Sequence, residues 1–375
     1  MNQQAKSLTE RWSMQIRDDP LTSLKYDAPP AWGVTDPDAG QLAWMIRGYW
    51  ISQIVGTLAR LGIADRLAGG PVAAAEIATS IGCDPDATYR LLRASRAVGL
   101  VATTSDGRFA LAPLGEKLRS GVPGSMRDSA IASTAPGHWL PWGRLSHAVR
   151  DGRCQTREAL GAGLFQYYSD HPAEGQAFTG AMSISSAKVA DEIAMILDTS
   201  GAERVVDVGG ASGTLISALL LRNPSLEGAI LERPDVVPHA RAAIAERGLS
   251  SRCRVVSGDF FESVPEADIH ILKYIIHDWD DEQSVLILSN CARALQPNGR
   301  VVLVEVAIPE DHRPSWASLM DLNMLAVLPG RERTVREYRD LLGRASLRLD
   351  RITPTASGFD LIEASAAESL KPETR

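Results

Sequence analysis

The chain has 375 residues, more than one compact core usually holds, and its 45% of hydrophobic residues suits a soluble protein of two packed units. No apolar stretch reaches the ~20 residues that span a bilayer, and the first twenty residues lack an apolar secretory signal, so we expect a cytoplasmic protein without a membrane partner. A formal net charge of -7 with no basic stripe argues against nucleic acid as a partner. Four scattered cysteines without a CxxC pair argue against a zinc site or a disulfide framework.

Composition and periodicity divide the chain into three parts: an N-terminal arm (residues 1–40), a winged-helix-like domain (41–122), and linking helices with an α/β domain (123–375). The arm is polar and rich in proline, and we assign it no fold. Apolar residues recur at helical spacing from Leu42 to Leu67, which predicts one long helix or two joined helices. These helices carry more large apolar side chains than one covered face needs, which predicts a homodimer.

Two shorter helices and a hairpin are predicted next. The first helix covers Ala73 to Gly82, and Asp84 can cap a second that runs toward Leu100. Two short strands around Asp106 and Gly107 complete a winged-helix pattern. Such a pattern can serve DNA binding, and a ligand-responsive DNA binder is therefore a hypothesis from another class, disfavoured by the acidic charge.

From about residue 203 short apolar runs alternate with helical stretches, which predicts a mostly parallel sheet wound with helices. A final hairpin around residues 357–358 is expected to close this sheet with an antiparallel strand. The predicted strands are Arg204–Val208, Ala229–Leu231, Arg254–Val256, Asp268–Tyr274 and Arg300–Val306, followed by the hairpin strands Leu347–Thr353 and Phe359–Ala364.

Three consecutive strands of this sheet end in groups suited to a nucleoside. The first runs into a glycine-rich turn, residues 209–213, whose glycine spacing differs from the dinucleotide fingerprint. The second ends at Glu232, whose carboxylate can accept hydrogen bonds from both ribose hydroxyls. The third leads to Asp259 and Phe260, an acceptor for an exocyclic amine and a ring to pack on adenine. Together they predict a nucleoside site at one edge of the sheet.

These residues resemble the class I S-adenosylmethionine-dependent O-methyltransferases of the caffeic-acid and bacterial polyketide-tailoring type, over nearly the whole chain. The resemblance is carried by the motifs at residues 207–213, 258–260, 272–279 and 330–334. It implies a Rossmann-like methyltransferase domain, whose sheet is mostly parallel with an antiparallel last strand, and a helical, winged-helix-like dimerisation domain. The expected partners are a second copy of the chain and a small hydroxylated acceptor.

The resemblance also assigns the cofactor site. S-Adenosylmethionine would bind with its methionine end at Gly209, its ribose at Glu232 and its adenine at Asp259 and Phe260. Many relatives have Asp where this chain has Glu232, but the longer acid can still reach the ribose. The complete set of expected cofactor residues is Asp207, Gly209, Glu232, Asp259, Phe260, Lys273 and Tyr274.

Three residues form the expected catalytic group: His277, just past the fourth strand, Glu305, near the end of the fifth, and Glu332, in the turn after Pro329. By resemblance both carboxylates converge on His277, where one of them fixes the tautomer and leaves the other ring nitrogen free as a base. The acid-base chemistry requires no metal, and we expect none. Asp280 with Gln283 predicts a capping box for the next helix.

By resemblance the acceptor pocket is aromatic and methionine-lined. Its expected residues are Trp139, Phe165, Tyr168, Phe178, Met182, Asn323 and Met324. The leading hypothesis is methyl transfer to a phenolic or enolic hydroxyl. An alternative keeps the fold and cofactor for hydroxylation or rearrangement, as in some relatives, and the complete histidine and glutamate set argues against it. The identity of the acceptor stays open.

Overall fold

The computed structural model describes residues 36–311 and 313–367. Contacts divide the chain into two compact units at Gln53 and Ile54, and each is described by itself. The predicted arm falls almost wholly outside the described residues, but its last residues begin helix α2 (Pro37–Ile46), which Asp36 caps. None of the described helices is long and apolar enough to cross a membrane.

The interval predicted as one or two helices contains three. Helix α2 is followed by α3 (Gly48–Arg60) and α4 (Ile63–Leu67). The chain turns at Arg47, and again at Gly62, which takes a left-handed conformation with φ of 64°. The sequence therefore predicted the helical residues correctly and the number of helices wrongly, because apolar spacing continues across both breaks.

The predicted winged-helix pattern is confirmed. Helices α5 (Ala74–Ile81) and α6 (Pro85–Ala97) precede the antiparallel strands β1 (Val101–Thr103) and β2 (Phe109–Leu111). Asp84 caps α6 by accepting a hydrogen bond from the Ala87 amide at 2.8 Å. A buried apolar core holds these elements together; it includes Leu58, Ile63, Leu67, Ile77, Leu92, Leu100 and Phe109.

Short helices lead from this domain to the sheet. They provide much of the wall of the cavity described below. In chain order they are η1 (Gly115–Leu118), α7 (Arg127–Thr134), α8 (Pro136–Trp142), α9 (Leu145–Asp151), α10 (Thr156–Leu160), α11 (Leu164–Asp170) and the long α12 (Pro172–Ile196).

The described residues contain a seven-stranded sheet in the order β5-β4-β3-β6-β7-β9-β8. Its first five strands are parallel and the last hairpin is antiparallel, as predicted. The strands are β3 (Arg204–Val208), β4 (Glu227–Glu232), β5 (Cys253–Ser257), β6 (Ala267–Lys273), β7 (Leu295–Glu305), β8 (Leu347–Pro354) and β9 (Asp360–Ala366). The connecting elements are α13 (Thr214–Arg222), α14 (Val237–Glu246), η2 (Ile276–Asp278), α15 (Asp281–Arg293), α16 (Trp316–Val327) and α17 (Val335–Arg344).

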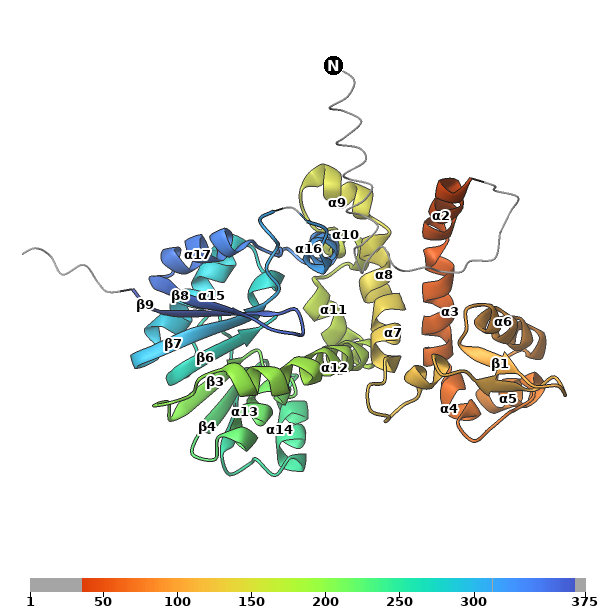
Figure 1. The fold of residues 1–375 in the computed structure, drawn as a ribbon, viewed down its shortest axis with the longest axis horizontal. Coiled ribbons are helices and arrows are strands. Elements are labelled where there is room, and N and C mark those ends of the chain that lie inside the picture. Colours follow the sequence, from red (N-terminus) through yellow and green to blue (C-terminus); the bar gives the residue numbers. More distant parts are fainter. Residues whose placement is uncertain (1–35, 312, 368–375) are drawn as a thin grey trace, which may run out of the picture. The chain divides into compact units, whose positions relative to one another are not determined.

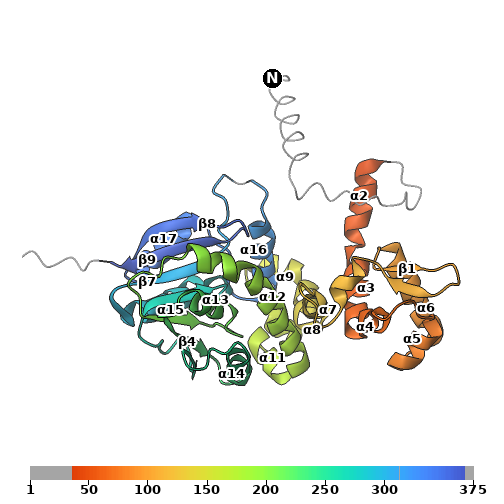
Figure 2. The same ribbon diagram turned by 60° about the horizontal axis from the view of Figure 1, so that its bottom comes forward.

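Helices cover both faces of the sheet (Figures 1 and 2). One core packs α12, α13 and α14 on odd-numbered residues of β3 and β6, such as Val205 and Ile271. The other core packs α15 and α17 on even-numbered neighbours, such as Val206 and Leu272. This alternation follows the two-residue period of a strand and explains why the parallel strands read as continuous apolar runs.

The strand order indicates which edge of the sheet binds a ligand. Strand β3 lies between β4 and β6, so successive connections leave it in opposite directions, and ligands of open α/β sheets bind at such a switch point. At the carboxyl ends of the parallel strands lie the turn after Val208, and then Glu232, Lys273 and Glu305. At the start of α15, Asp280 accepts a hydrogen bond from the Gln283 amide, which is one half of the predicted capping box. A complete capping box is formed by Thr334 and Glu337 at the start of α17.

Candidate active site

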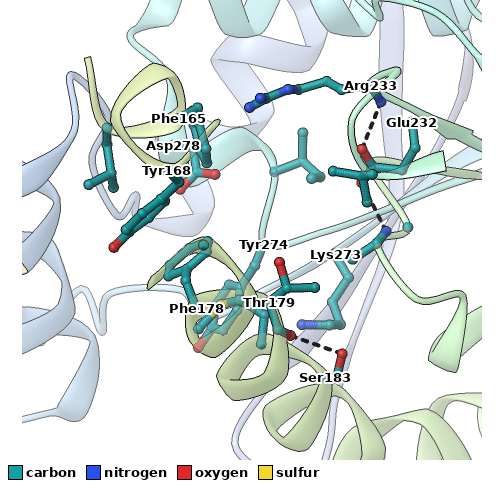
Figure 3. A pocket seen from close by; sticks show the side chains of 18 of the residues that line it. Phe165, Tyr168, Phe178, Thr179, Ser183, Glu232, Arg233, Lys273, Tyr274 and Asp278 are labelled. Atoms are coloured by element: carbon teal, nitrogen blue, oxygen red, sulfur yellow. Dashed lines mark hydrogen bonds between the residues drawn. The ribbon is translucent and has the colours of Figure 1, made fainter. Parts of the chain in front are cut away.

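A cavity of about 1420 Å³ opens at the carboxyl edge of the sheet. Figure 3 shows Glu232 and Lys273 on one side of it and Phe165, Tyr168 and Phe178 on the other. All of the residues expected to bind the cofactor line this cavity, namely Asp207, Gly209, Glu232, Asp259, Phe260, Lys273 and Tyr274. The structure therefore brings that predicted set together.

The turn after β3 offers its backbone to the cavity. Gly209 has a φ of 72°, and a Cβ atom there would meet Ile275 Cδ1 at 2.5 Å and approach the Phe260 ring. Only glycine suits both the conformation and the space. This backbone cradle leaves room for a ligand to lie close to the main chain, which fits the methionine end of S-adenosylmethionine.

Glu232 is fixed at the end of β4 by backbone amides. Its Oε1 accepts a hydrogen bond from the Ala211 amide at 2.9 Å, and its Oε2 accepts one from the Arg233 amide at 2.8 Å (Figure 3). Burial raises the pKa of this carboxyl, and the two amides oppose that rise. The carboxylate thus ties the glycine-rich turn to β4 and keeps lone pairs for two ribose hydroxyls.

The expected adenine end of the cavity is formed by the segment after β5. Asp259 Oδ1 accepts a hydrogen bond from the Phe261 amide at 2.8 Å. The Phe260 ring packs edge-on against Trp279, with centroids 6.0 Å apart. The main chain at Phe260 is held from α15, because Asn290 Nδ2 donates to its carbonyl at 2.7 Å. The cavity wall therefore holds an aromatic ring and a carboxylate on consecutive residues, a combination that suits the expected adenine.

Lys273 and Tyr274 connect the cofactor half to the catalytic group. The Lys273 ammonium lies 4.7 Å from the Tyr274 ring centroid, and burial lowers its pKa while nearby carboxylates oppose the fall. Tyr274 has a φ of 52°, and its ring stacks on His277 with centroids 4.4 Å apart and planes within 1°. Tyr274 thus packs directly on the His277 imidazole in addition to lining the cavity.

The three residues expected to act in catalysis converge. His277 Nδ1 lies 2.7 Å from Glu332 Oε1. Glu305 Oε1 accepts hydrogen bonds from the Ile275 and Ile276 amides at 3.3 and 3.0 Å, so Glu305 holds the backbone that carries the histidine. A ring nitrogen of His277 and one carboxylate oxygen from each glutamate all lie within 4.8 Å of one another. Both acid-base sites and metal sites have this spacing. The direct contact of Glu332 with the ring favours the acid-base role.

Burial dominates the electrostatics of this group. It raises the pKa of Glu305 to about 7 and that of Glu332 to about 8. Asp278, which the sequence analysis did not select, has its Oδ1 3.2 Å from His277 Nε2, and burial raises its pKa to about 7. Its position next to His277 in the chain was the available signal. The nitrogen that would act as a base therefore faces an acidic residue at the cavity wall.

Gly330 and Arg333, in the turn before α17, allow the Glu332 segment to pack closely against the segment that carries His277. A Cβ atom on Gly330 would collide with the His277 carbonyl, so only glycine permits this approach. The Arg333 guanidinium is 1% exposed and donates to the carbonyls of Ile276 and Trp279 at 3.0 and 2.9 Å. The sequence analysis includes Arg333 only within the motif at residues 330–334 and does not predict that it binds these carbonyls.

The acceptor half of the cavity is aromatic. Tyr168 and Phe178 stack at 4.8 Å, and Phe165 packs against Trp279 at 6.1 Å. Asn323 Oδ1 accepts a hydrogen bond from Trp142 Nε1 at 2.9 Å. Of the expected acceptor residues, those that line the cavity are Phe165, Tyr168, Phe178, Met182, Asn323 and Met324.

The placement of Trp139 in this wall is wrong. On α8 the residues that line the cavity are His138 and Trp142, which lie four positions apart on one stripe of the helix. Trp139 is rotated about 100° from His138 around the helix axis and lies off that stripe. Both missed residues are polar or amphipathic neighbours of Trp139, but the sequence of a seven-residue helix does not fix which of its faces turns inward.

Comparison with known proteins identifies the family. Residues 142–348 match the O-methyltransferase domain and residues 44–120 the O-methyltransferase dimerisation domain. The phenazine O-methyltransferase PhzM of Lysobacter antibioticus is 36% identical over 88% of this chain and 96% of its own length. The structure of the mitomycin 7-O-methyltransferase MmcR has a TM-score of 0.83 at 34% identity, covering 88% of this chain and 98% of that one.

A third relative bears on the cofactor. The O-methyltransferase NcsB1 from neocarzinostatin biosynthesis was solved in complex with S-adenosylmethionine and 2-hydroxy-5-methyl naphthoic acid. It has a TM-score of 0.75 at 32% identity, covering 84% of this chain and 96% of that one. Together with the cradle at Gly209, the fixed carboxylate of Glu232 and the His277 group, these matches show that the chain belongs to the S-adenosylmethionine-dependent O-methyltransferases and carries their dimerisation domain.

Proposed function

We propose that this enzyme methylates a phenolic or enolic hydroxyl of a small aromatic acceptor, with His277 as the general base. The observation that carries this proposal is the 2.7 Å contact of His277 Nδ1 with Glu332. In its ionised form, whose fraction grows as pH rises toward the raised pKa of about 8, Glu332 accepts the Nδ1–H bond, which fixes one tautomer and leaves Nε2 without a proton. Nε2 lies 3.2 Å from Asp278 Oδ1 at the cavity wall, so a hydroxyl bound in the cavity reaches Nε2 by replacing that contact.

S-Adenosylmethionine supplies a methyl group on a positively charged sulfur. The residues of the chain supply the proton transfer and the alignment. His277 Nε2 takes the hydroxyl proton as the oxygen–carbon bond forms and the carbon–sulfur bond breaks, and Glu332 stabilises the resulting imidazolium. Glu305 holds the Ile275 and Ile276 amides, so the imidazole keeps its position while its charge changes. A free phenol has a pKa near ~10, so a neighbouring base matters at neutral pH.

The chemistry of the wall supports an aromatic acceptor. Stacked rings and the thioethers of Met182 and Met324 contact flat apolar molecules well, while Asn323 offers an amide for orientation. The names of the similar enzymes point the same way, since they refer to phenazine, to mitomycin and to a naphthoic acid. The presence of His277, Glu305 and Glu332 together favours methyl transfer over hydroxylation or rearrangement in the same fold.

Three further assignments belong to this proposal. The cavity residues named for cofactor and acceptor act in those roles. The domains run 1–40, 41–122 and 123–375, in line with the matches at 44–120 and 142–348. The enzyme works in the cytoplasm, which suits its unpaired cysteines Cys83, Cys154, Cys253 and Cys291.

Incubation with methyl-labelled S-adenosylmethionine tests the function. The acceptors are a panel of phenols, naphthols and hydroxylated nitrogen heterocycles, with arylamines of matched shape as controls. We expect label in an ether product. Label only in the amine products would make the enzyme an N-methyltransferase, and acceptor consumed without label would favour the non-methylating alternative.

A further inference from the structure

His138 is a polar group on the acceptor wall that the methyl-transfer step does not use. It belongs to α8 and lines the cavity. Its Nδ1 lies 2.8 Å from the hydroxyl of Tyr168, and its ring packs beside Phe178 with centroids 5.8 Å apart. Tyr168 itself stacks on Phe178. The imidazole is therefore held in one orientation by a hydrogen bond and two aromatic neighbours.

The imidazole is neutral at physiological pH. Burial lowers the pKa of His138 to about 4. At the start of α12, close to His138 and Tyr168, Glu174 accepts hydrogen bonds from the Gly137 amide at 2.6 Å and the Tyr167 hydroxyl at 3.2 Å. That carboxylate is thus engaged elsewhere, and within residues 36–311 and 313–367 burial alone shifts the pKa of His138.

The Tyr168 contact selects the tautomer. A buried hydroxyl needs an acceptor for its proton, and within the part of the chain that the structure describes His138 Nδ1 is the acceptor in hydrogen-bond contact with the Tyr168 hydroxyl. Tyr168 therefore donates to Nδ1, and the ring proton resides on Nε2. Among the described residues Nε2 has no hydrogen-bond partner, which leaves its N–H for a molecule in the cavity.

We propose that His138 determines acceptor specificity by donating its Nε2–H to a neutral hydrogen-bond acceptor on the substrate, such as a ring nitrogen or carbonyl oxygen, away from the hydroxyl that is methylated. This inference rests on the proposed function, because it assigns the aromatic half of the cavity to the acceptor. It adds a second anchoring point to the one at His277. A flat molecule held at both points has a single orientation, which sets the hydroxyl that reacts.

Two variants separate the two ring nitrogens. In His138→Asn the side-chain polar group lies near the place of Nδ1, so it keeps the partner of Tyr168 and loses the N–H in the cavity. In His138→Gln the amide reaches the place of Nε2 and retains a donor there. Trp139→Phe is the control for disturbance of α8, because Trp139 lies outside the cavity lining.

The probes are 6-hydroxyquinoline and 2-naphthol, which have the same shape and differ by a ring nitrogen remote from the hydroxyl. We expect the wild-type enzyme to prefer 6-hydroxyquinoline by roughly 10-fold in kcat/KM, the usual effect of one hydrogen bond. His138→Asn should reduce the ratio to about 1, while His138→Gln and Trp139→Phe should keep most of it. An unchanged ratio in His138→Asn overturns the proposal.

Calorimetric binding of the two probes to the full-length enzyme loaded with S-adenosylhomocysteine gives a readout without turnover. The same preference in dissociation constants, lost in His138→Asn, supports the role of His138 even if neither probe is methylated, while the proposed function is judged separately by the panel of acceptors. Binding of neither probe overturns the proposal. Nitrogen-15 spectra of the histidines provide a second check, since a charged imidazole or a proton on Nδ1 at pH 6 also contradicts it.

Discussion

His277 and Glu332 meet across two segments that lie 55 residues apart in the chain, with His277 Nδ1 2.7 Å from Glu332 Oε1 and both residues buried. The contact depends on Gly330, where any side chain would push the turn away from the His277 carbonyl. It also depends on Arg333, which binds the carbonyls on either side of the histidine turn. The active site is therefore assembled by packing of the two backbones, and the ring contact follows from it.

Glu332→Gln tests the importance of that contact. The amide keeps the size of the side chain but cannot stabilise an imidazolium and can favour the wrong tautomer. We expect kcat to fall by roughly 10²-fold while the affinity for S-adenosylhomocysteine, measured by calorimetry, stays within about twofold. Asp321→Asn is an informative second variant, because Asp321 accepts a hydrogen bond from the backbone amide of Glu332 and its charge helps to raise the pKa of the Glu332 carboxyl. A fall in cofactor affinity as large as the fall in kcat would instead indicate collapse of the site.

The free energy of unfolding of the ligand-free enzyme should decrease between pH 6.5 and 8. Burial raises the pKa of Asp207, Asp278 and Glu305 to about 7 and that of Glu332 to about 8. Across this range the folded protein holds more protons than the unfolded chain, so stability falls as pH rises. His138 acts with the opposite sign, but only between its lowered pKa of about 4 and the ordinary 6.5.

Melting temperatures measured from pH 6.5 to 8 check this prediction. Glu305→Gln removes one titrating carboxyl and should flatten the dependence. Lys273 opposes this trend, because its lowered pKa makes the free energy of unfolding increase with pH in the range below 10.5. A wild-type melting temperature that rises over this range, with the same slope in Glu305→Gln, would show that the buried carboxyls are ionised throughout.

The cofactor half of the cavity predicts a specific thermal shift. S-Adenosylhomocysteine at 100 times its dissociation constant should stabilise the folded state by ~2.7 kcal/mol. Glu232→Ala removes the anchor of the Ala211 amide, and Asp259→Ala removes the anchor of the Phe261 amide. Each should abolish most of the shift in differential scanning fluorimetry. Stabilisation by NAD and not by S-adenosylhomocysteine would contradict the cofactor assignment.

The sequence predicted best those strands that can be recognised from a local run of apolar residues alone. The β3 strand was predicted over its full observed range, and the end of β4 at Glu232 follows from the apolar run before it. The convergence of Glu232, Asp259 and Lys273 then follows from the rule that carboxyl ends of parallel strands share an edge. No knowledge of side-chain packing was needed for this half of the site.

The site residues that the sequence did not predict are His138, Asp278 and Arg333. Their positions depend on the rotation of a helix about its axis or on tertiary contacts. His138 lines the cavity and Trp139 does not, yet the two are neighbours on a helix too short to show a periodic face. Asp278 meets His277 Nε2 because η2 is a single tight turn, which the capping signal at Asp280 did not reveal. Arg333 is buried by bonds to main-chain carbonyls, and main-chain partners leave no mark in a sequence.

The N-terminal helices predict self-association. Large apolar side chains on α2 and α3 are exposed, among them Met45 at 70% and Ile46 at 62%, and Leu42, Tyr49 and Trp50 also lie at the surface. A patch of this kind in the matched dimerisation domain should be covered by a second copy. We expect a homodimer that buries more than ~2,000 Å². Light scattering at micromolar concentration checks this, and Ile46→Asp should shift the mass toward the monomer; a monomeric wild type would contradict it.

The pH dependence of a His277→Ala variant decides between base catalysis and proximity. If His277 removes the hydroxyl proton, the variant should lose ~10² to 10⁴ in kcat near neutral pH and keep its affinity for the cofactor. The loss should shrink as pH approaches the pKa of the acceptor, since a phenolate formed in solution no longer needs the base. Tyr274→Phe keeps the ring that stacks on His277 and serves as the control.

The same variant with acceptors of graded acidity sharpens this test. A phenol that carries electron-withdrawing groups is ionised at lower pH, so the ratio of wild-type to variant kcat should fall along the series. A ratio that stays constant across acceptors and pH would mean that His277 positions the acceptor without taking its proton. Near-normal turnover of the variant at neutral pH would show that alignment alone, which can remove ~7 to 11 kcal/mol of barrier, accounts for the catalysis.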